Sequence, residues 1–244
     1  MEVLGIDIGG TGIKGAIVNV ETGILLTEKF RVPTPEGATP KDVAIQVGII
    51  VRHFDWKGKV GCGFPAIIAN GVAKSCGNIA ESWLGVEVGA LFHNETGLDF
   101  FVANDADVAG LAEIHFGAAQ KHSGMVVMLT VGTGLGSGVF FNRTLVPNVE
   151  LGAAPYKKYK RIEQYTANSV RKKEDLSYTD WGKRLNEFLK LTVTMFSPEL
   201  IVLGGGVSKK IHKYENQFTV EVPVVAAALQ NNAGIVGAAM LVPR

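Results

Sequence analysis

Two glycine-rich turns contain the residue types that most clearly suggest chemistry in this chain. The first, Gly9-Gly10-Thr11-Gly12, follows an apolar run that contains one carboxylate, Asp7. The second follows another apolar run and comprises Gly132, Thr133, Gly134 and Gly136. Because glycine has no Cβ, backbone N–H groups in such turns can approach a polyanion such as a phosphate. A carboxylate beside a phosphate-binding turn suits a Mg²⁺ counter-ion, so Asp7 is a candidate metal residue.

The residues after the first turn separate it from other glycine motifs. Gly10, Gly12 and Gly15 fit G-x-G-x-x-G, but the dinucleotide-binding version of that pattern requires a helix after the turn. Residues 13–20 and 24–32 instead have the composition of strands, which predicts a strand–turn–strand unit. No Walker-type G-x-x-x-x-G-K-[ST] sequence occurs. A glycine turn without any ligand is the alternative interpretation.

Two further candidate sites follow predicted strands. Asn104-Asp105-Ala106-Asp107 lies where an apolar strand, residues 98–103, meets a helix that runs to Phe116. Open α/β sheets bind ligands at this end of their strands, although an aspartate there can equally cap the helix. A later strand, residues 200–203, opens into Gly204-Gly205-Gly206, and this turn could admit a nucleotide or another phosphate.

An internal repeat connects the two main glycine turns. Residues 4–18 and 128–141 share one plan, an apolar strand, a Thr/Gly-rich turn and a second strand. Such a repeat predicts two similar lobes, with a phosphate chain held in a cleft between them. Chance similarity between glycine turns is the alternative.

The other elements must position these residues. Thr39 as N-cap, Pro40 and Asp42 predict a helix start, and residues 59–64 read as a strand. Residues 66–85 look irregular, and the polar and aromatic groups at 73–85 suit either a sugar-binding face or an ordinary surface loop. Helices are expected at 86–93, at 181–196, where the pattern is amphipathic, and at 233–241, where small residues dominate. Basic runs at 156–161 and 171–173 suggest solvated helix faces or, alternatively, an anion track.

Composition narrows the class of protein. The chain has 244 residues, is 47% hydrophobic and carries a formal net charge of +1, which argues against a general nucleic-acid or membrane-surface binder. Cys62 and Cys76 are its two cysteines and lack metal-type spacing, so free thiols are expected. The sequence contains neither a signal peptide nor a transmembrane run. We therefore expect a soluble cytoplasmic protein.

Taken together, these motifs resemble those of one family. The segments DIGGTGIKG, SWLG, NDADVAG, LTVGTGLGSG, LVPNVELG, GGGVSKK and NNAGIVGAA occur in the order and spacing found in sugar kinases of the ROK group, within the actin-like ATPase superfamily. Within that group the chain is most similar to the bacterial polyphosphate glucokinases. The resemblance covers nearly the whole chain. It implies an α/β, two-lobed actin-like ATPase (ribonuclease H-like) fold with duplicated lobes: a small lobe at 1–105, against which 233–244 packs, and a large lobe at 106–232.

The resemblance also implies a role for each candidate residue. Asp105 matches the general base that takes the proton from the sugar 6-hydroxyl, and Asp7 matches the carboxylate that organises Mg²⁺ through water. The residues matching sugar contacts are Asn78, Asn104, Asp105 and Glu150. The phosphate-binding residues are Gly9, Gly10, Thr11, Gly12 and Lys14 in the first turn, and Gly132, Thr133, Gly134 and Gly136 in the second. Gly205 and Gly206 match the adenosine-side turn, and Lys209, Lys210 and Lys213, with the two earlier basic runs, are candidates for a long polyanion track.

The implied activity is transfer of the terminal phosphoryl group of inorganic polyphosphate, or of ATP, to the 6-hydroxyl of glucose. The family commonly has histidine where this chain has Ala153, so the sugar preference could differ. The cysteine-rich zinc motif of many ROK proteins is absent, as it is in the polyphosphate branch. An ATP-dependent hexokinase and a non-catalytic sugar-binding relative are the alternatives. DNA binding is not expected, because the chain starts on its first strand without a helix-turn-helix, whereas a homodimer is expected by analogy with the family.

Overall fold

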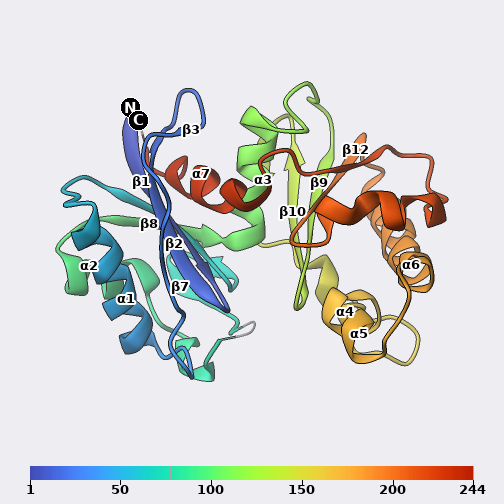
Figure 1. Ribbon diagram of the computed structural model, residues 1–244, viewed down its shortest axis with the longest axis horizontal. Coiled ribbons are helices and arrows are strands. Elements are labelled where there is room, and N and C mark those ends of the chain that lie inside the picture. The colour runs from blue at the N-terminus through green and yellow to red at the C-terminus, as the bar shows by residue number, and fades with distance from the viewer. Residues whose placement is uncertain (77–78, 244) are drawn as a thin grey trace. The chain divides into compact units, whose positions relative to one another are not determined.

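The computed structural model describes residues 1–76 and 79–243 of the chain. Its backbone separates into two compact units. The first comprises residues 1–112 together with the C-terminal segment that starts at Asn232, and the second comprises Glu113–Asn231. Each unit is built around one principal mixed β-sheet, and Figure 1 labels the main elements of both.

The first glycine turn joins two neighbouring strands in the sheet of the first unit. Its strands are β1 (Glu2–Gly9), β2 (Gly12–Asn19), β3 (Ile24–Leu25), β4 (Phe30–Val32), β5 (Val60–Phe64) and β8 (Phe100–Asn104). β1 and β2 are antiparallel, in a register that places Gly9 opposite Gly12. β5 and β8 continue the sheet parallel to β1, giving the order β3-β2-β1-β5-β8, with β4 also paired to β2. The predicted strand–turn–strand unit is therefore confirmed.

The strand predicted for residues 24–32 is present as two short pieces. β3 and β4 both pair with β2, at its C-terminal and N-terminal parts respectively. Between them, the Ile17 N–H donates to the side-chain hydroxyl of Thr27 at 3.1 Å. A side-chain oxygen that takes the place of a backbone acceptor interrupts the ladder. The prediction of one continuous strand was wrong for this reason.

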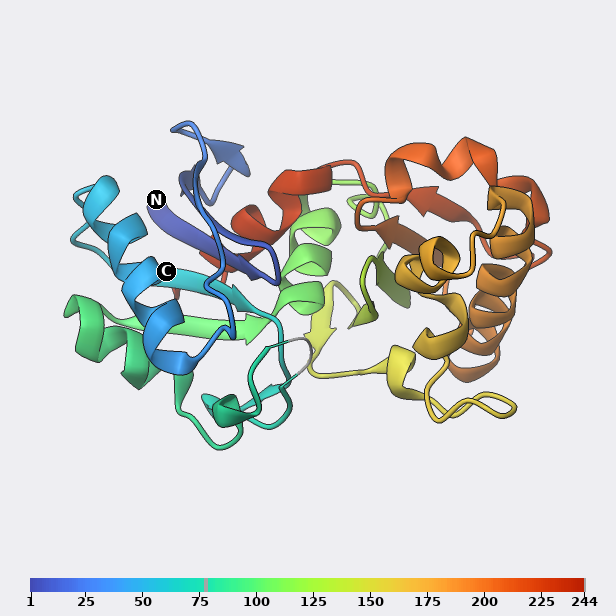
Figure 2. The same cartoon turned by 60° about the horizontal axis from the view of Figure 1, so that its bottom comes forward.

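Helices cover both faces of the first sheet (Figures 1 and 2). They are α1 (Pro40–His53), α2 (Val88–Thr96), α3 (Asp105–Phe116), whose last turn belongs to the second unit, and α7 (Ala233–Ala239). α1 and α2 pack together on one face, and α7 packs on β1 and β5 from the other. α1 starts as predicted, since Thr39 is its N-cap and the Thr39 hydroxyl accepts the Asp42 N–H at 3.3 Å.

Three glycines allow α7 to approach its neighbours closely. A Cβ at Gly5 would overlap the Ile235 carbonyl oxygen, and a Cβ at Gly61 would overlap that of Ala238. Gly237, on α7 itself, leaves room for the Val108 backbone of α3. Close packing between backbones explains these glycines, so they are not evidence for a ligand-binding site.

The segment predicted to be irregular, residues 66–85, contains a small hairpin. Its strands are β6 (Ile68–Ala69) and β7 (Val72–Ala73), joined by Asn70 and Gly71 with φ values of +52° and +78°. Asn-Gly is the dipeptide that favours such a turn. After it, the short 3₁₀ helix η1 (Glu81–Trp83) buries Trp83 completely, and the Trp83 indole N–H donates to Ala38 O at 2.8 Å. Trp83 is therefore a core residue, so its ring belongs neither to a sugar-binding face nor to a surface loop, the two interpretations offered for residues 73–85.

The second unit repeats the strand arrangement of the first. Its sheet is formed by β9 (Val126–Val131), β10 (Leu135–Phe141), β11 (Thr144–Val146), β12 (Leu200–Gly204) and β13 (Val224–Ala226). The order is β11-β10-β9-β12-β13, with antiparallel pairing on the β10 side of β9 and parallel pairing on the β12 side. The first sheet has the same order of directions around β1. The repeat predicted from the two glycine turns is thus a duplicated fold.

Helical segments complete the second unit. They are α4 (Glu163–Thr166), α5 (Asn168–Lys173), α6 (Tyr178–Phe196) and the 3₁₀ helices η2 (Leu151–Ala153), η3 (Ser208–Lys213), η4 (Glu215–Gln217) and η5 (Gln230–Asn232), the last of which ends in the first unit. α6 buries Trp181, Leu185 and Phe188 in the core beside the sheet. It starts three residues before the predicted position, because Ser177 caps it and accepts the Asp180 N–H at 3.0 Å. Across the described ranges, no helix has both the length and the apolar character needed to span a membrane.

Candidate active site

The first glycine turn is a two-residue loop, Gly10-Thr11, at the end of the β1–β2 hairpin. Both residues are exposed. Gly10 has no left-handed φ, and a Cβ built on it would meet no atom within 4 Å. Neither backbone conformation nor packing within the protein therefore requires glycine here. Open space above the backbone is what a closely approaching ligand would need.

Two side chains hold this loop from one side. Arg31 of β4 donates from Nη2 to the Thr11 carbonyl oxygen at 2.7 Å, and the Thr34 hydroxyl donates to the Gly9 carbonyl oxygen at 2.5 Å. The Arg31 guanidinium lies so close to Gly12 that a Cβ there would be 2.5 Å from it. The loop therefore directs two carbonyl groups toward the protein and carries a cation beside it. Sequence reasoning missed Arg31, because only the pairing of β4 with β2 brings it to the loop.

Asp7 and Lys14 face each other across the same hairpin. Their backbones are register partners, and Lys14 Nζ lies 3.6 Å from Asp7 Oδ2. Burial raises the pKa of the Asp7 carboxyl above its usual range, and the Lys14 ammonium opposes that rise. Glycines surround the carboxylate, since a Cβ at Gly234 would lie 2.7 Å from Asp7 Cγ and one at Gly63 would lie 3.9 Å from Asp7 Oδ1.

The end of β8 places Asn104 and Asp105 at the same edge of the sheet. The Asn104 Oδ1 accepts the N–H groups of Ala106 at 2.8 Å and Asp107 at 3.3 Å, while its amide donates to Ala66 O at 3.2 Å. Asn104 thus caps α3, a role that the sequence interpretation had offered to an aspartate. Asp105 is partly exposed, and its Oδ1 accepts the Ala106 N–H at 2.8 Å.

Gly63 lies between the two candidate carboxylates of the first unit, Asp7 and Asp105. A Cβ at Gly63 would lie 3.8 Å from Asp105 Cα and 3.9 Å from Asp7 Oδ1. The parallel pairing of β1, β5 and β8 brings their C-terminal ends together here. The structure therefore brings Asp7, Asn104 and Asp105 to one edge of the first sheet. Asn78, another predicted sugar contact, lies outside the described residues.

The second glycine turn lies between β9 and β10 in the second unit. The register of Val131 with Leu135 leaves Gly132-Thr133-Gly134 as the loop, and Gly136 follows within β10. A Cβ at Gly132 would meet nothing within 4 Å, and Gly132 has no left-handed φ, so it resembles Gly10 in both respects. Ser169 of α5 anchors the loop, because its N–H donates to Gly132 O at 3.2 Å and its hydroxyl donates to Thr133 O.

The third glycine turn, Gly205-Gly206, follows β12 at the same sheet edge, because β12 pairs with β9. Gly205 has φ +79°, and a Cβ there would overlap the Val131 carbonyl oxygen, so the fold itself requires this glycine. Gly206 has neither constraint, as at Gly10 and Gly132. Lys209 and Lys210 are exposed on η3, directly after the turn.

Two glutamates lie close to the second turn. Burial raises the pKa of Glu150 above its ordinary value, the negative charge of Glu163 adds to the rise, and Arg161 opposes it. Glu163 Oε2 accepts the Leu135 N–H in a long hydrogen bond of 3.4 Å, and its Oε1 accepts Arg161 Nη1 at 2.9 Å. Sequence reasoning selected Glu150 but missed Glu163, which no local pattern distinguishes. Ala153 is exposed on η2, the short helix that follows Glu150.

The first unit thus has carboxylates beside one glycine turn, and the second unit has two further glycine turns at one edge of its own sheet. Across the described part of the chain, no group of three or more His, Cys, Asp or Glu side chains is placed to hold a metal ion. An ion that takes one protein carboxylate, waters and phosphate oxygens, as Mg²⁺ does in many phosphoryl-transfer enzymes, would need no such group. The chemistry that the arrangement can support is transfer of a phosphoryl group held by backbone amides and cations.

Known proteins share both the sequence and the fold. A family model described as ROK family matches residues 3–150. The chain is 42% identical over 237 residues to the polyphosphate glucokinase of Mycobacterium tuberculosis, covering 97% of this chain and 89% of that protein. The crystal structure of the inorganic polyphosphate/ATP-glucomannokinase from Arthrobacter sp. strain KM superposes with a TM-score of 0.94 at 41% identity, covering 98% of this chain and 97% of that one.

A more distant structure shares the fold alone. The ROK family glucokinase from Streptomyces griseus, crystallised with glucose and AMPPNP, has a TM-score of 0.86 at 23% identity and covers 99% of both chains. The fold is therefore that of the ROK sugar kinases with their actin-like ATPase architecture, as the sequence predicted. By its family-model match and its relatives above 40% identity, this chain belongs to the ROK family.

Proposed function

We propose that this protein is a polyphosphate glucokinase, which transfers the terminal phosphoryl group of inorganic polyphosphate to the 6-hydroxyl of glucose and also accepts ATP. The names of its relatives support the substrates. The observation that carries the proposal is that Gly10 and Gly132, at the tips of two equivalent hairpins, are glycines for which the protein itself gives no reason. Phosphate groups that approach the backbone at each tip would supply that reason.

Asp105 acts in this proposal as the general base. It stands at the first position of α3, where the helix dipole favours the ionised carboxylate. Its hydrogen bond from the Ala106 N–H fixes the orientation of one oxygen. Phosphoryl transfer depends mainly on positioning and charge stabilisation, so a fixed carboxylate at the sugar hydroxyl matters more than high basicity.

Asp7 is the residue that would hold Mg²⁺ in this site. Its carboxylate lies against Gly234, where a Cβ would come within 2.7 Å of Asp7 Cγ, so the absence of a side chain there lets the carboxylate stand at the strand end. One carboxylate, acting directly or through water, fits the usual binding of Mg²⁺ together with substrate phosphates. When bound, the ion would neutralise charge on the donor phosphates. Lys14 lies next to Asp7 and adds a fixed positive charge at the first turn.

The remaining predicted residues have complementary roles. Gly9, Gly10, Thr11 and Gly12 would bind phosphate in the first unit, and Gly132, Thr133, Gly134 and Gly136 in the second. The donor would also contact Gly206, Lys209 and Lys210, at and directly after the turn that follows β12. Gly205 would shape that turn. Asn104 and Glu150 would contact sugar hydroxyls, as would Asn78. For Asn104 this contact would add to its role as the cap of α3.

Ala153 favours a second candidate, a ROK hexokinase with a different sugar or donor preference. A side chain that contacts a buried sugar hydroxyl contributes roughly 1–3 kcal/mol, and alanine makes no such hydrogen bond. Mannose and other hexoses therefore belong in the same assay as glucose. The family resemblance also supports a cytoplasmic homodimer, and light scattering of the purified protein tests the dimer.

The deciding experiment measures sugar 6-phosphate formation from glucose and Mg²⁺, with polyphosphate and ATP supplied separately. Asp105→Asn keeps the size of the side chain and should lower kcat by at least about 100-fold, which is the usual contribution of a general base. Its melting temperature provides the folding control. Turnover with ATP alone would indicate an ordinary ATP-dependent hexokinase. Failure with every hexose and both donors would indicate a non-catalytic sugar-binding protein.

A further inference from the structure

The positive charge of this protein is concentrated in one segment of the second unit, residues 156–173, here called the cationic segment. It holds seven of the 24 Lys and Arg residues of the chain and one of the 23 Asp and Glu residues. Its formal charge is therefore +6, whereas the rest of the chain carries −5. A nearly neutral net charge conceals this asymmetry. A local field of this size attracts polyanions.

The cationic segment is attached to the second glycine turn at two points. Glu163 accepts the Leu135 N–H at 3.4 Å, and Ser169 bonds to the carbonyl oxygens of Gly132 and Thr133. Lys172 and Lys173 follow Ser169 on the same short helix, α5. The basic side chains therefore begin beside the loop that holds donor phosphates in the proposed function.

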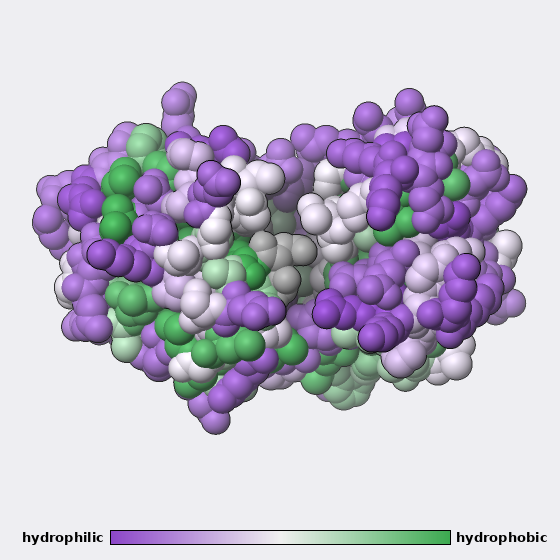
Figure 3. Space-filling view, turned by 90° about the horizontal axis from the view of Figure 1, so that it is seen from below, coloured by the Kyte–Doolittle hydropathy of each residue, from purple (hydrophilic) through white to green (hydrophobic). Residues whose placement is uncertain are grey.

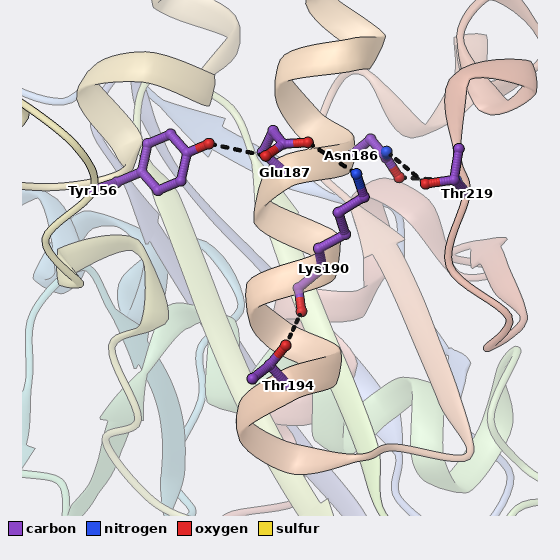
Figure 4. A network of polar contacts seen from close by, with 6 residues as sticks. All are labelled: Tyr156, Asn186, Glu187, Lys190, Thr194 and Thr219. Atoms are coloured by element: carbon purple, nitrogen blue, oxygen red, sulfur yellow. Dashed lines mark hydrogen bonds and ion pairs between the residues drawn. The ribbon is translucent and has the colours of Figure 1, made fainter.

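The first part of the cationic segment is a rigid tip rather than a loose loop. Tyr156 and Tyr159 exchange two backbone hydrogen bonds, of 3.1 and 2.8 Å, with Lys157 and Lys158 between them. The Tyr156 hydroxyl donates to Glu187 on α6 at 3.0 Å, and Lys190 binds the same carboxylate at 3.1 Å (Figure 4). Because the backbone of the tip is held, its ammonium groups lose less freedom when they bind a ligand.

Several charges of the cationic segment have no internal counter-ion. Arg161 pairs with Glu163, but in the part of the chain that the structure describes none of Lys158, Lys160, Lys172 and Lys173 takes part in an ion pair. All four are exposed. The space-filling view shows strongly hydrophilic surface on the side of the second unit that carries α4 and α5 (Figure 3).

The tyrosines of the segment argue for an inorganic polyanion rather than a nucleic acid. Tyr165 packs on Tyr156 with ring centroids 5.4 Å apart, and the Lys157 and Arg184 cations lie 5.8 and 4.7 Å from its centroid. Lys158 lies 5.6 Å from the centre of the Tyr159 ring. Proteins that bind single strands stack bases on aromatic side chains. Here each tyrosine ring already contacts another tyrosine ring and a cation of the protein, so positive charge is the main feature that the surface offers to a ligand.

We propose that the cationic segment binds the distal phosphates of a long polyphosphate donor whose reacting end is held at the glycine turns. This inference rests on the proposed function. It adds the part of the protein that would make binding depend on the length of the polyphosphate. Phosphates beyond the first few would interact with Lys157, Lys158, Lys160, Lys172 and Lys173. Affinity should therefore increase with donor length, and tripolyphosphate or ATP should gain little from the segment.

The test compares two variants that remove positive charges from the segment with a control whose charge change equals that of the larger variant. The variants are the triple Lys157→Gln, Lys158→Gln, Lys160→Gln and the double Lys172→Gln, Lys173→Gln. The control is Lys57→Gln, Lys74→Gln, Lys121→Gln, three exposed lysines outside the segment. For each protein, the KM for long-chain polyphosphate is divided by the KM for tripolyphosphate, and binding of long-chain polyphosphate is measured by titration at several salt concentrations. Melting temperatures verify folding.

The triple variant should raise the KM ratio by roughly 3- to 100-fold, the range expected for loss of three exposed charge contacts. By analogy with single-stranded nucleic acids, the slope of log affinity against log salt should become shallower by about two. The control should change neither. A ratio equal to that of the control in both variants would overturn the inference while leaving the glucokinase proposal intact. A larger effect of Lys209→Gln, Lys210→Gln would locate the distal phosphates beside η3 and would also overturn it.

Binding separates failure of the inference from failure of the proposed function. A protein that binds long polyphosphate through the segment but turns over only ATP would contradict the donor proposal alone. A wild-type protein that does not bind long polyphosphate would overturn the inference. An RNA oligomer of matched charge that binds as tightly, and loses binding in the triple variant, would identify a nucleic-acid surface and overturn it as well.

Discussion

Alanine substitution at Gly10 and at Gly205 should separate ligand access from folding. At Gly10 the φ angle lies outside the left-handed region and a Cβ would meet no atom within 4 Å. Alanine at such a site stabilises a protein by roughly 0.4–1 kcal/mol, because the unfolded chain has fewer conformations to lose. At Gly205, φ is +79° and a Cβ would overlap the Val131 carbonyl oxygen. The left-handed conformation alone costs alanine roughly 1–2 kcal/mol, and the overlap adds to that cost.

Thermal unfolding and donor kinetics on both variants provide the assay. One kcal/mol corresponds to about 2–4 °C in a protein of this size, so Gly10→Ala should melt about 1–4 °C higher and Gly205→Ala at least about 2 °C lower. In Gly10→Ala the new methyl group occupies the space through which a phosphate would approach. Loss of one charge-assisted contact should lower kcat/KM for polyphosphate by roughly tenfold or more. A Gly10→Ala protein that is stable and fully active would refute the argument that a ligand explains this glycine.

Two further predictions follow from burial and charge. Trp83→Phe removes the N–H that donates to the Ala38 carbonyl oxygen. The free energy of unfolding, measured in urea, should fall by about 1–3 kcal/mol, with little change in the KM for glucose. A raised KM for glucose at unchanged stability would instead support a sugar-binding role for this residue. Glu150→Gln tests a carboxyl whose pKa is raised in the folded protein by burial and by Glu163. The neutral form then suits the native state, so wild-type stability is lost as pH rises through that raised pKa. At neutral pH the variant should therefore melt at a higher temperature than the wild type. Below the ordinary glutamate pKa of about 4.3 the two proteins should melt at the same temperature. A variant that melts with the wild type at neutral pH as well would contradict the raised pKa.

Local signals explain what the sequence could predict. The β1–β2 and β9–β10 hairpins were predictable because an apolar run, a glycine turn and a second apolar run each lie within a few residues of one another. The start of α1 was equally local, since Thr39, Pro40 and Asp42 form the cap. Asp7 and Asp105 were selected because they stand at strand ends, and the parallel pairing of β1, β5 and β8 does bring them beside Gly63.

Partners distant in the sequence explain what could not be predicted. β13 has three residues and exists because it pairs with β12. Trp83 is buried because its indole reaches Ala38, 45 positions earlier. Three neighbouring polar residues could have capped α3, and only the geometry shows that the Asn104 side chain receives both N–H groups. Glu163 follows from no motif, since its place in the site depends on a hydrogen bond to Leu135.

The duplicated fold shows why glycine turns alone could not locate the chemistry. β1 and β9 are equivalent strands that each lead into a glycine turn, yet near its end the first strand has Asp7, whereas the second has Thr130 and contains no carboxylate. At the ends of the equivalent strands β8 and β13, the first unit has Asn104 and Asp105, whereas the second has Ala226 and Ala227. Phosphate-type turns are therefore a property of the repeated scaffold, while the strand-end carboxylates belong to one copy. A base and a metal-organising carboxylate are needed once per reaction, but a phosphate chain can use two amide-lined turns. This asymmetry supports assigning proton transfer to the first unit and the capture of a long donor to the second, where the cationic segment lies.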